Sequence, residues 1–362
     1  MDQKLQDKLN KRIQEGTIRS LSLFDDFVDF YSNDYLGLSK LKDGVSEFSS
    51  FSSTGSRLIS GTSKESLNTE RNLADFFGVE SAIVYNSGYD ANLGFFSSVP
   101  QKGDEVFYDE YIHASIRDGI RLSFASNFSF KHNDLKDLES RISKSTSTKY
   151  VVIESLYSMD GDISPLQEIA DLCSRYNAFL IVDEAHACGV IGENGKGFVS
   201  LLGLESSVFA RVVTFGKAYG AHGACVLGAK NLIEYLINFS RSFIYTTALP
   251  PDSYSRILFT VLHPEITARQ NRLEEIIKYF RDRIYPLVCS SDIISPIQSI
   301  RIGNIEKTKA ISEKLQRLNI AVKPIFSPTV PVGNEGLRIC LHAFNTEDQI
   351  DILVNSLKDF IN

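Results

Sequence analysis

The fold is decided by two segments, FLIVDEAHACG at residues 179–189 and VVTFGKAYGAHGACVLG at residues 212–228. Each begins with a short apolar run, and Asp183 ends the first run while Lys217 lies just beyond the second. Short continuous apolar runs of this kind are typical of strands that are buried on both faces of a sheet. Because ligands of open α/β sheets bind beyond the carboxyl ends of the strands, we expect Asp183 and Lys217 to face one crevice.

The same pattern extends through the first 250 residues. Similar runs at 82–85, 105–108, 150–154, 211–214 and 224–227 predict further strands, and amphipathic stretches such as 166–176 predict helices between them. A segment rich in Ser and Gly, 45–66, predicts a loop. Alternating strands and helices indicate an α/β fold in which a mainly parallel sheet is wrapped by helices.

The C-terminal part has a different pattern. After Pro250 and Pro251, one long helical pattern runs to Tyr285, followed by a strand at 297–302, a helix at 307–318, a strand at 337–342 and a helix at 346–360. This order predicts a smaller α+β domain. We predict an N-terminal arm at 1–45 that belongs to the small domain, a large cofactor-binding domain at 46–250 and the C-terminal small domain at 251–362.

Composition narrows the class of protein. The 362 residues carry a formal charge of −7, which argues against nucleic acid as a partner. No apolar run is long enough to span a membrane, and the polar N-terminus lacks the apolar core of a signal peptide. The five cysteines include no CxxC pair, which predicts free thiols in a reducing cytoplasm and no metal site.

Asp183 and Lys217 carry the predicted chemistry. Asp183 could pair with a cationic ring nitrogen, or it could cap the segment that follows the strand. Lys217 could be a surface residue in a turn, but its apolar and small neighbours favour a desolvated nucleophile. An aspartate for a pyridinium nitrogen and a lysine for an imine are the two groups that pyridoxal 5′-phosphate (PLP) requires. We therefore predict PLP as the cofactor.

Segments upstream of Asp183 could complete this site. NSGYDAN at 86–92 follows a predicted strand and could open a helix whose N–H groups bind a phosphate, with Tyr89 contacting the ring. His113 could stack on a flat cofactor, although a lone histidine is usually structural. ESLYSMDGDISPL places Glu154 and Ser158 beyond another strand, where MDGD could equally form a turn.

Ten segments in order resemble the α-oxoamine synthases, a fold-type I PLP-dependent family of acyltransferases. Besides those above, they include DFYSNDYLGLS, TGSRLISGT, FKHNDLKDLE, YTTALPP and GLRICLHAFNT. The resemblance covers nearly the whole chain and is closest to the group that makes 8-amino-7-oxononanoate for biotin synthesis. It implies a cytoplasmic homodimer that condenses L-alanine with a pimeloyl thioester, either pimeloyl-CoA or pimeloyl-carrier protein.

The resemblance also implies roles for residues at the cofactor. Lys217 would form the imine and then act as the base, Asp183 would bind the pyridine nitrogen, and His113 would stack on the ring. The other cofactor contacts that it implies are Gly88, Tyr89, Ser158, His186 to the phenolic oxygen, Thr214 to the phosphate, and Thr247 to the phosphate of the neighbouring subunit.

For the substrates, the resemblance implies that Asn33 and Arg338 bind the carboxylate of the amino acid and that Arg19 contacts the acyl group. Strand alternation places Arg338 on one face with Cys340 and His342. The alternative for Arg338 is an exposed position on an edge strand.

Two positions depart from the family pattern, and several functions stay open. Ser66 stands where the family often has histidine, and Ala224 follows Gly223 where a glycine pair is common. Sister enzymes that use glycine or serine are the main alternative: glycine C-acetyltransferase, 5-aminolevulinate synthase and serine palmitoyltransferase. A non-catalytic scaffold subunit and an aminotransferase are further alternatives.

Overall fold

The computed structural model describes residues 3–19, 21, 23–24, 26–41, 52–285, 287, 292, 294–327 and 329–361. Its chain divides into two compact units. One unit comprises Met1–Ser32, Met159–Asp162 and Leu273–Asn362, and the other comprises Asn33–Ser158 and Ile163–Arg272. The domain limits predicted after residues 45 and 250 stay a prediction.

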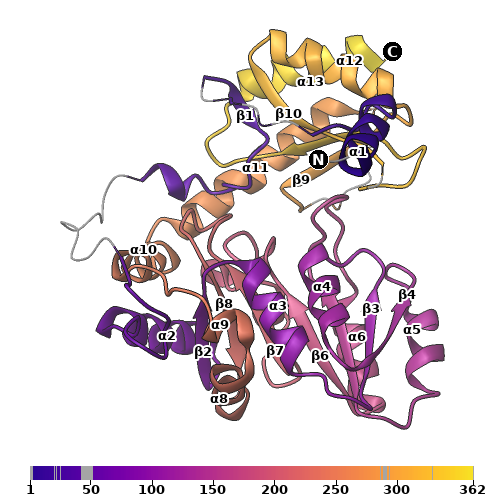
Figure 1. The fold of residues 1–362 in the computed structure, drawn as a ribbon. Coiled ribbons are helices and arrows are strands. Elements are labelled where there is room, and N and C mark those ends of the chain that lie inside the picture. The colour runs from indigo at the N-terminus through magenta and orange to yellow at the C-terminus, as the bar shows by residue number, and fades with distance from the viewer. Residues whose placement is uncertain are drawn as a thin grey trace. The chain divides into compact units, whose positions relative to one another are not determined.

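The larger unit contains a seven-stranded sheet in the order β2-β8-β7-β6-β5-β3-β4 (Figure 1). Its strands are β2 (Ser81–Tyr85), β3 (Glu105–Asp109), β4 (Ser126–Phe130), β5 (Lys149–Glu154), β6 (Ala178–Asp183), β7 (Ala210–Thr214) and β8 (Ala224–Gly228). The pairs from β4 through β3, β5 and β6 to β7 are all parallel, and β8 is antiparallel to both of its neighbours. The prediction of a mainly parallel sheet is confirmed.

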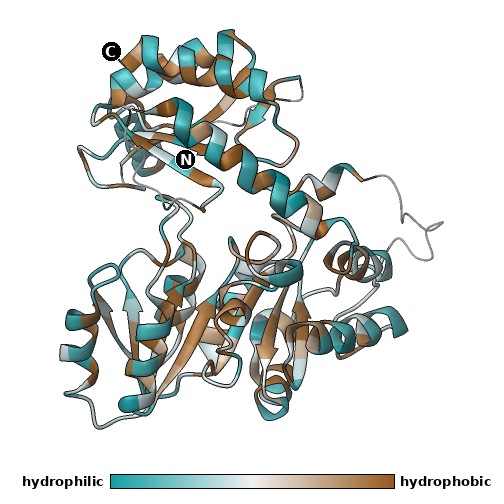
Figure 2. Ribbon diagram, turned by 180° about the vertical axis from the view of Figure 1, so that it is seen from behind, coloured by the Kyte–Doolittle hydropathy of each residue, from teal (hydrophilic) through white to brown (hydrophobic). Residues whose placement is uncertain are grey.

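Helices wrap this sheet because its strands are apolar on both faces. Figure 2 shows the hydrophobic strands, and in the core Phe95, Val152, Ile181 and Val226 are fully buried. Burying each such side chain stabilises the fold by roughly 1.5–3 kcal/mol. The α-helices of this unit include α2 (Lys64–Phe77), α3 (Gly88–Ser98), α4 (Ala114–Leu122), α5 (Leu135–Ile142), α6 (Leu166–Arg175), α7 (Phe198–Leu201), α8 (Lys230–Phe239), α9 (Arg241–Ile244) and α10 (Pro251–Val261), and its short 3₁₀ helices are η1 (Leu38–Lys40) and η2 (Glu193–Gly195). Among them, α3 packs against β2, β7 and β8, and α6 packs against β6.

The sequence did not predict β4, and the predicted loop at 45–66 was three residues too long. Strand β4 has the polar sequence SNFSF, and four of its five residues are exposed at the edge of the sheet. Helix α2 begins at Lys64 because Ser63 caps it, and Ser66 closes a reciprocal capping box with Ser63. Residues 45–51 of the predicted loop lie outside the described residues.

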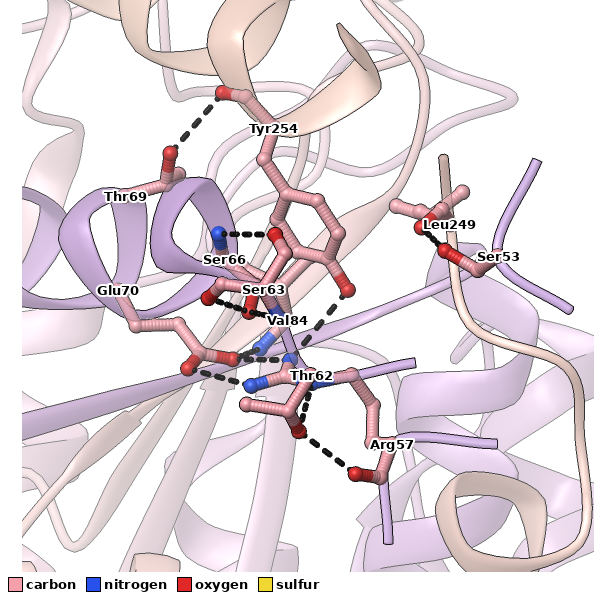
Figure 3. A network of polar contacts seen from close by, with 10 residues as sticks. All are labelled: Ser53, Arg57, Thr62, Ser63, Ser66, Thr69, Glu70, Val84, Leu249 and Tyr254. Carbon is pink, nitrogen blue, oxygen red and sulfur yellow. Dashed lines mark hydrogen bonds and ion pairs between the residues drawn. The ribbon is translucent and has the colours of Figure 1, made fainter. Parts of the chain in front are cut away.

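The loop before α2 is fixed by a buried ion pair (Figure 3). Arg57 donates to both carboxylate oxygens of Glu70, at 2.7 and 2.9 Å, and its Nη1 also lies 3.3 Å from the Tyr254 hydroxyl. Glu70 Oε1 in turn accepts a hydrogen bond from the Val84 amide on β2, at 3.0 Å. This network ties the TGSRLISGT segment to the sheet and to α10.

The smaller unit contains a four-stranded sheet in the order β1-β10-β11-β9. Its strands are β1 (Val28–Phe30), β9 (Ile297–Arg301), β10 (Ile320–Ile325) and β11 (Gly336–Cys340), and its helices include α1 (Gln3–Gln14), α12 (Ile305–Arg317) and α13 (Glu347–Ile361). Helix α12 packs against β10, β11 and α13. The predicted α+β character is confirmed, although β1 and β10 were not predicted.

The prediction of one long helix through Tyr285 was wrong. The chain instead forms α10 and α11 (Ile266–Ile284), and the break contains Pro264. Proline lacks the N–H group that a continuous helix needs, and its ring clashes with the preceding turn. Among the described residues, no helix is long and apolar enough to cross a bilayer.

Candidate active site

A pocket of about 260 Å³ lies where β5, β6 and β7 end, in the larger unit. Eight residues that the sequence predicted for the site line it: Asn33, Gly88, Tyr89, His113, Asp183, His186, Thr214 and Lys217. Its wall also contains Ser87, Asn92, Ser115, Glu154, Ala185, Gly216, His222 and Gly223. The pocket therefore lies at the edge of the sheet where the rule for open α/β sheets expects a ligand.

The two carboxylate oxygens of Asp183 have different partners. The side chain is only 4% exposed; Oδ1 accepts from the Ala185 amide at 2.9 Å, and Oδ2 accepts from Asn92 Nδ2 at 2.8 Å. One oxygen thus closes the turn after β6, as the capping alternative expected, although no described helix begins there. The Asp183 side chain still lines the pocket.

The Lys217 ammonium group lies inside the pocket. Its Nζ is 2.9 Å from His186 Nε2, and His186 Nδ1 is 2.8 Å from the Tyr35 hydroxyl. Tyr35 is fully buried and donates to Asn33 Oδ1 at 3.0 Å. His186 therefore lies between Lys217 and Tyr35, with Nε2 towards the Lys217 Nζ atom and Nδ1 towards the Tyr35 hydroxyl. The alternative of a lysine in a surface turn is not what the structure shows.

His113 caps the N-terminus of α4 with its imidazole. The Ser115 amide donates to His113 Nδ1 at 3.3 Å, and the Ser115 hydroxyl is 2.7 Å from the same nitrogen. Nδ1 is therefore unprotonated, and the neutral ring carries its proton on Nε2. Desolvation by the pocket wall lowers the pKa of His113, and the Lys217 charge lowers it further, against an opposing effect of Asp183. These two effects favour the neutral form of the ring.

Asn92 and Ser115 connect His113 to Asp183. Asn92 Nδ2 lies 2.8 Å from Asp183 Oδ2 and 3.1 Å from Ser115 Oγ, which in turn contacts His113. Neither residue was among the site residues predicted from the sequence. Asn92 belongs to the NSGYDAN segment and lies one helical turn after Gly88, so the periodicity of α3 is the signal that could have found it.

Glu154 lies in the pocket wall at the end of β5. It is 3% exposed, and desolvation raises its pKa well above the ordinary value, with the nearby Asp183 charge as the second cause. Its carboxyl group accepts a hydrogen bond from the His113 backbone amide. Glu154 Oε1 and Asn92 Oδ1 are buried without a partner among the described residues. The wall thus offers polar atoms that a ligand can satisfy.

The N-terminus of α3 adds a place for an anion. The helix begins at Gly88 after the Ser87 cap, and a Cβ atom on Gly88 would lie 2.5 Å from Thr214 Cγ2. Only glycine allows this close approach of α3 to the end of β7. Backbone N–H groups at a helix start bind phosphate well, and Thr214 lies beside them in the same pocket.

The structure does not place the remaining predicted site residues in this pocket. Ser158 is half-buried in the turn after β5, and Thr247 is exposed, with its carbonyl accepting from Asn86 Nδ2 at 2.8 Å. Arg19 is exposed in the smaller unit. Arg338 is 6% exposed on the inner strand β11, with Nη1 2.9 Å from Cys340 Sγ, so the exposed edge-strand alternative was wrong.

The two departures from the family pattern have simple structural settings. Ser66 takes part in the capping box of α2. Ala224 is fully buried at the start of β8, where it pairs with Tyr85 and Thr214. Neither residue belongs to the lining of the pocket that contains Lys217 and Asp183.

Known proteins match this chain along nearly its whole length. Residues 25–357 match the family described as aminotransferase class I and II. The chain belongs to this family. It is 36% identical to the 8-amino-7-oxononanoate synthase of Emericella nidulans, over 99% of this chain and 95% of that protein.

Solved structures of the family agree with this assignment. The 8-amino-7-oxononanoate synthase of Francisella tularensis is 32% identical, with a TM-score of 0.78 over 92% of this chain and 98% of that chain. A serine palmitoyltransferase of S. paucimobilis with a bound PLP–myriocin aldimine is 26% identical, with a TM-score of 0.90 over 98% of this chain and 96% of that chain. The resemblance found in the sequence is confirmed: this family member is an α-oxoamine synthase-type enzyme with the fold-type I architecture.

Proposed function

We propose that this enzyme is an 8-amino-7-oxononanoate synthase of biotin biosynthesis. It condenses L-alanine with a pimeloyl thioester, carried by coenzyme A or a carrier protein, and releases carbon dioxide. The observation that carries the proposal is the pocket that joins Lys217, Asp183 and His113 in a chain whose full-length relatives bear this name. A cytoplasmic homodimer, in which Thr247 serves the neighbouring subunit, is part of the proposal.

The pocket residues fit PLP. Lys217 would hold the cofactor covalently, Asp183 would pair with its ring nitrogen, and His113 would lie on its ring. The phosphate would bind at Thr214 and at the N–H groups that open α3, and Gly88 and Tyr89 would lie beside the ring. His186 would bind the phenolic oxygen, and Ser158 would also lie at the cofactor. The partnerless Glu154 Oε1 and Asn92 Oδ1 support a polar ligand here. When bound, PLP supplies a conjugated, protonated ring that accepts the electron pair released at the substrate Cα.

The protein groups around the ligand control charge and protons. The lowered pKa of His113 favours its neutral form, which does not compete with a cationic ring nitrogen for Asp183. Lys217 Nζ, held 2.9 Å from His186 Nε2, would remove the proton from the alanine Cα and later return it. Arg338 and Asn33 would bind the alanine carboxylate, for which the planar guanidinium offers two parallel donors, and Arg19 would contact the acyl chain.

The test is a product analysis of the purified enzyme with added PLP. L-Alanine, glycine and L-serine are each combined with pimeloyl-CoA, pimeloyl-carrier protein, acetyl-CoA, succinyl-CoA and palmitoyl-CoA, and products are identified by mass. We expect 8-amino-7-oxononanoate from alanine with a pimeloyl thioester and no product from the Lys217→Ala variant. A main product from glycine would contradict the proposal and identify a sister enzyme. Keto-acid formation without carbon dioxide release would identify an aminotransferase.

Serine palmitoyltransferase is the second candidate because its backbone superposes with the higher TM-score, 0.90 against 0.78. Sequence identity favours the first candidate, at 32% against 26% for the same two structures. The reaction of serine with palmitoyl-CoA in the product panel separates the two candidates directly.

A further inference from the structure

The short segment that leads to His113 begins at Asp109, the last residue of β3. Asp109 is 0% exposed and does not line the pocket. Its Oδ1 accepts from the Tyr111 amide at 2.8 Å and lies 2.9 Å from His132 Nδ1, while its Oδ2 accepts from the Asn133 amide at 2.9 Å. A single buried carboxylate thus joins the DEYIH segment to the KHND segment that follows β4.

His132 holds the same two segments together from the other side. Its ring stacks on the Tyr111 ring with centroids 4.4 Å apart and meets the Tyr157 ring edge-on at 4.5 Å. Its backbone amide donates to Glu110 Oε1 at 3.0 Å, and the Glu110 amide donates to the Phe130 carbonyl at 3.0 Å. Side chains and backbone therefore link residues 109–111 to residues 130–133.

The far end of this segment is bound to the pocket wall. The Glu154 carboxyl group, which is buried at the end of β5, accepts from the His113 backbone amide. Residues 109–113 are consequently held at both ends by buried polar groups. Between those ends lie Glu110 and Tyr111, which are exposed, and Ile112, which is buried in the core.

We propose that Asp109 and His132 are positioning residues that act through His113. The pair fixes the backbone of residues 110–113, and this backbone sets the place of the His113 ring in the pocket wall. The effect on catalysis rests on the proposed function, in which His113 lies on the cofactor ring. A small displacement of a positioning group can reduce a rate about 100-fold, so the accuracy of this attachment matters.

Two substitutions of His132 separate its hydrogen bond from its ring contacts. His132→Phe keeps an aromatic ring against Tyr111 and Tyr157 but removes the donor to Asp109. His132→Asn removes the ring but places an amide nitrogen near the Nδ1 position, where it can still donate. His132→Gln, whose amide nitrogen reaches the Nε2 position instead, is a second variant that should behave as His132→Phe does. His263→Phe, in the loop between α10 and α11, is the matched control.

The first readout is amide hydrogen exchange in the cofactor-free protein, followed at Tyr111 and Asn133, whose amides both donate to Asp109. We expect faster exchange in His132→Phe and His132→Gln, and near wild-type exchange in His132→Asn and the control. The second readout is the visible absorption of the PLP-loaded enzyme and its kcat/KM for alanine. For His132→Phe we expect a shifted band and a loss of about 10- to 100-fold, largely recovered in His132→Asn.

Unchanged exchange in folded His132→Phe and His132→Gln would overturn the proposal, as would faster exchange with an unchanged PLP band and unchanged kcat/KM. Recovery in His132→Asn would support it, because ring packing alone cannot explain rescue by a residue without a ring. A failure of the proposed function would appear separately, as a wild-type enzyme that neither binds PLP nor forms product. In that case the exchange result alone would still decide whether the pair holds the segment.

Discussion

Asp183→Asn removes one charge from the pocket and almost nothing else. The asparagine keeps the side-chain shape, and its oxygen can still accept from the Ala185 amide. Its new NH₂ group, however, would face Asn92 Nδ2, which lies 2.8 Å from the present carboxylate oxygen. The Asn92 amide can rotate to present its oxygen instead, because Asn92 Oδ1 has no partner among the described residues. This rotation also withdraws Asn92 Nδ2 from Ser115 Oγ, so the cost to folding is two rearranged hydrogen bonds, about 1–3 kcal/mol.

The expected cost to catalysis is much larger. Removing one preorganised electrostatic group from an active site raises the barrier by about 2.7–4 kcal/mol, or roughly 10²- to 10³-fold in kcat. The two costs differ because folding only needs Asp183 to be hydrogen-bonded, whereas the reaction needs its charge opposite the cofactor ring nitrogen. We therefore expect a melting temperature within a few degrees of wild type and a rate lower by two to three orders of magnitude.

The assay follows exchange of the alanine Cα proton in D₂O by proton NMR, with PLP present and no acyl thioester. This isolates the step that depends on the ring nitrogen. Asp348→Asn, an exposed aspartate in α13, is the matched control and should exchange at the wild-type rate. Exchange in Asp183→Asn within a few-fold of wild type would refute the role of Asp183. Equal losses of rate and of folding would instead mean that the residue is structural.

Three further outcomes follow from the structure. Because the pKa of buried Glu154 is raised, the folded protein binds more protons than the unfolded chain above the ordinary glutamate pKa, and stability falls as pH rises towards the folded pKa. Glu154→Gln removes this effect, so the melting temperature of the cofactor-free variant, relative to wild type, should be higher at pH 8 than at pH 5. An equal difference in melting temperature at both pH values would contradict the raised pKa of Glu154. Arg57→Met leaves the largely buried Glu70 carboxylate without its ion-pair partner (Figure 3) and should lower the free energy of unfolding in urea by about 3–5 kcal/mol. Much of this loss should be recovered in Arg57→Met/Glu70→Leu. A loss below about 1 kcal/mol would show that the pair is effectively solvated. Arg338→Ala should reduce kcat/KM for alanine by a factor between several-fold and about a thousandfold, and Arg338→Lys should reduce it less. Wild type should prefer alanine to glycine by about tenfold because of the alanine methyl group. Unchanged steady-state kinetics for alanine in Arg338→Ala would contradict the role of Arg338 in binding the carboxylate.

The sequence predicted the central strands well because each is buried on both faces and therefore continuously apolar. It missed β4 because that edge strand exposes most of its residues, and a sequence such as SNFSF resembles a loop. It missed β10 as well, which contains Pro324. A proline also accounts for the missed helix break at Pro264: the helical pattern continues on both sides of this residue, but proline cannot continue a helix.

The pocket was predictable to the extent that its residues follow strands. Asp183, Thr214 and Lys217 lie at or just beyond strand ends, so the chain order alone brought them together. Tyr35, Asn92 and Ser115 were missed because their role comes from contacts across the fold: Tyr35 meets His186 from a segment about 150 residues away. Such contacts depend on tertiary packing, and only for Asn92 does the helical periodicity of α3 offer a local signal.

The most direct test of the account is where PLP becomes attached to the protein. The enzyme is incubated with PLP, reduced with sodium borohydride and digested with trypsin, and the modified peptides are identified by mass spectrometry. Modification of Lys217 blocks cleavage there, so we expect a single pyridoxyl peptide that spans residues 212–230, lost in Lys217→Ala. Modification spread over other lysines, or a modified peptide that persists in Lys217→Ala, would contradict the central claim that this pocket holds PLP on Lys217.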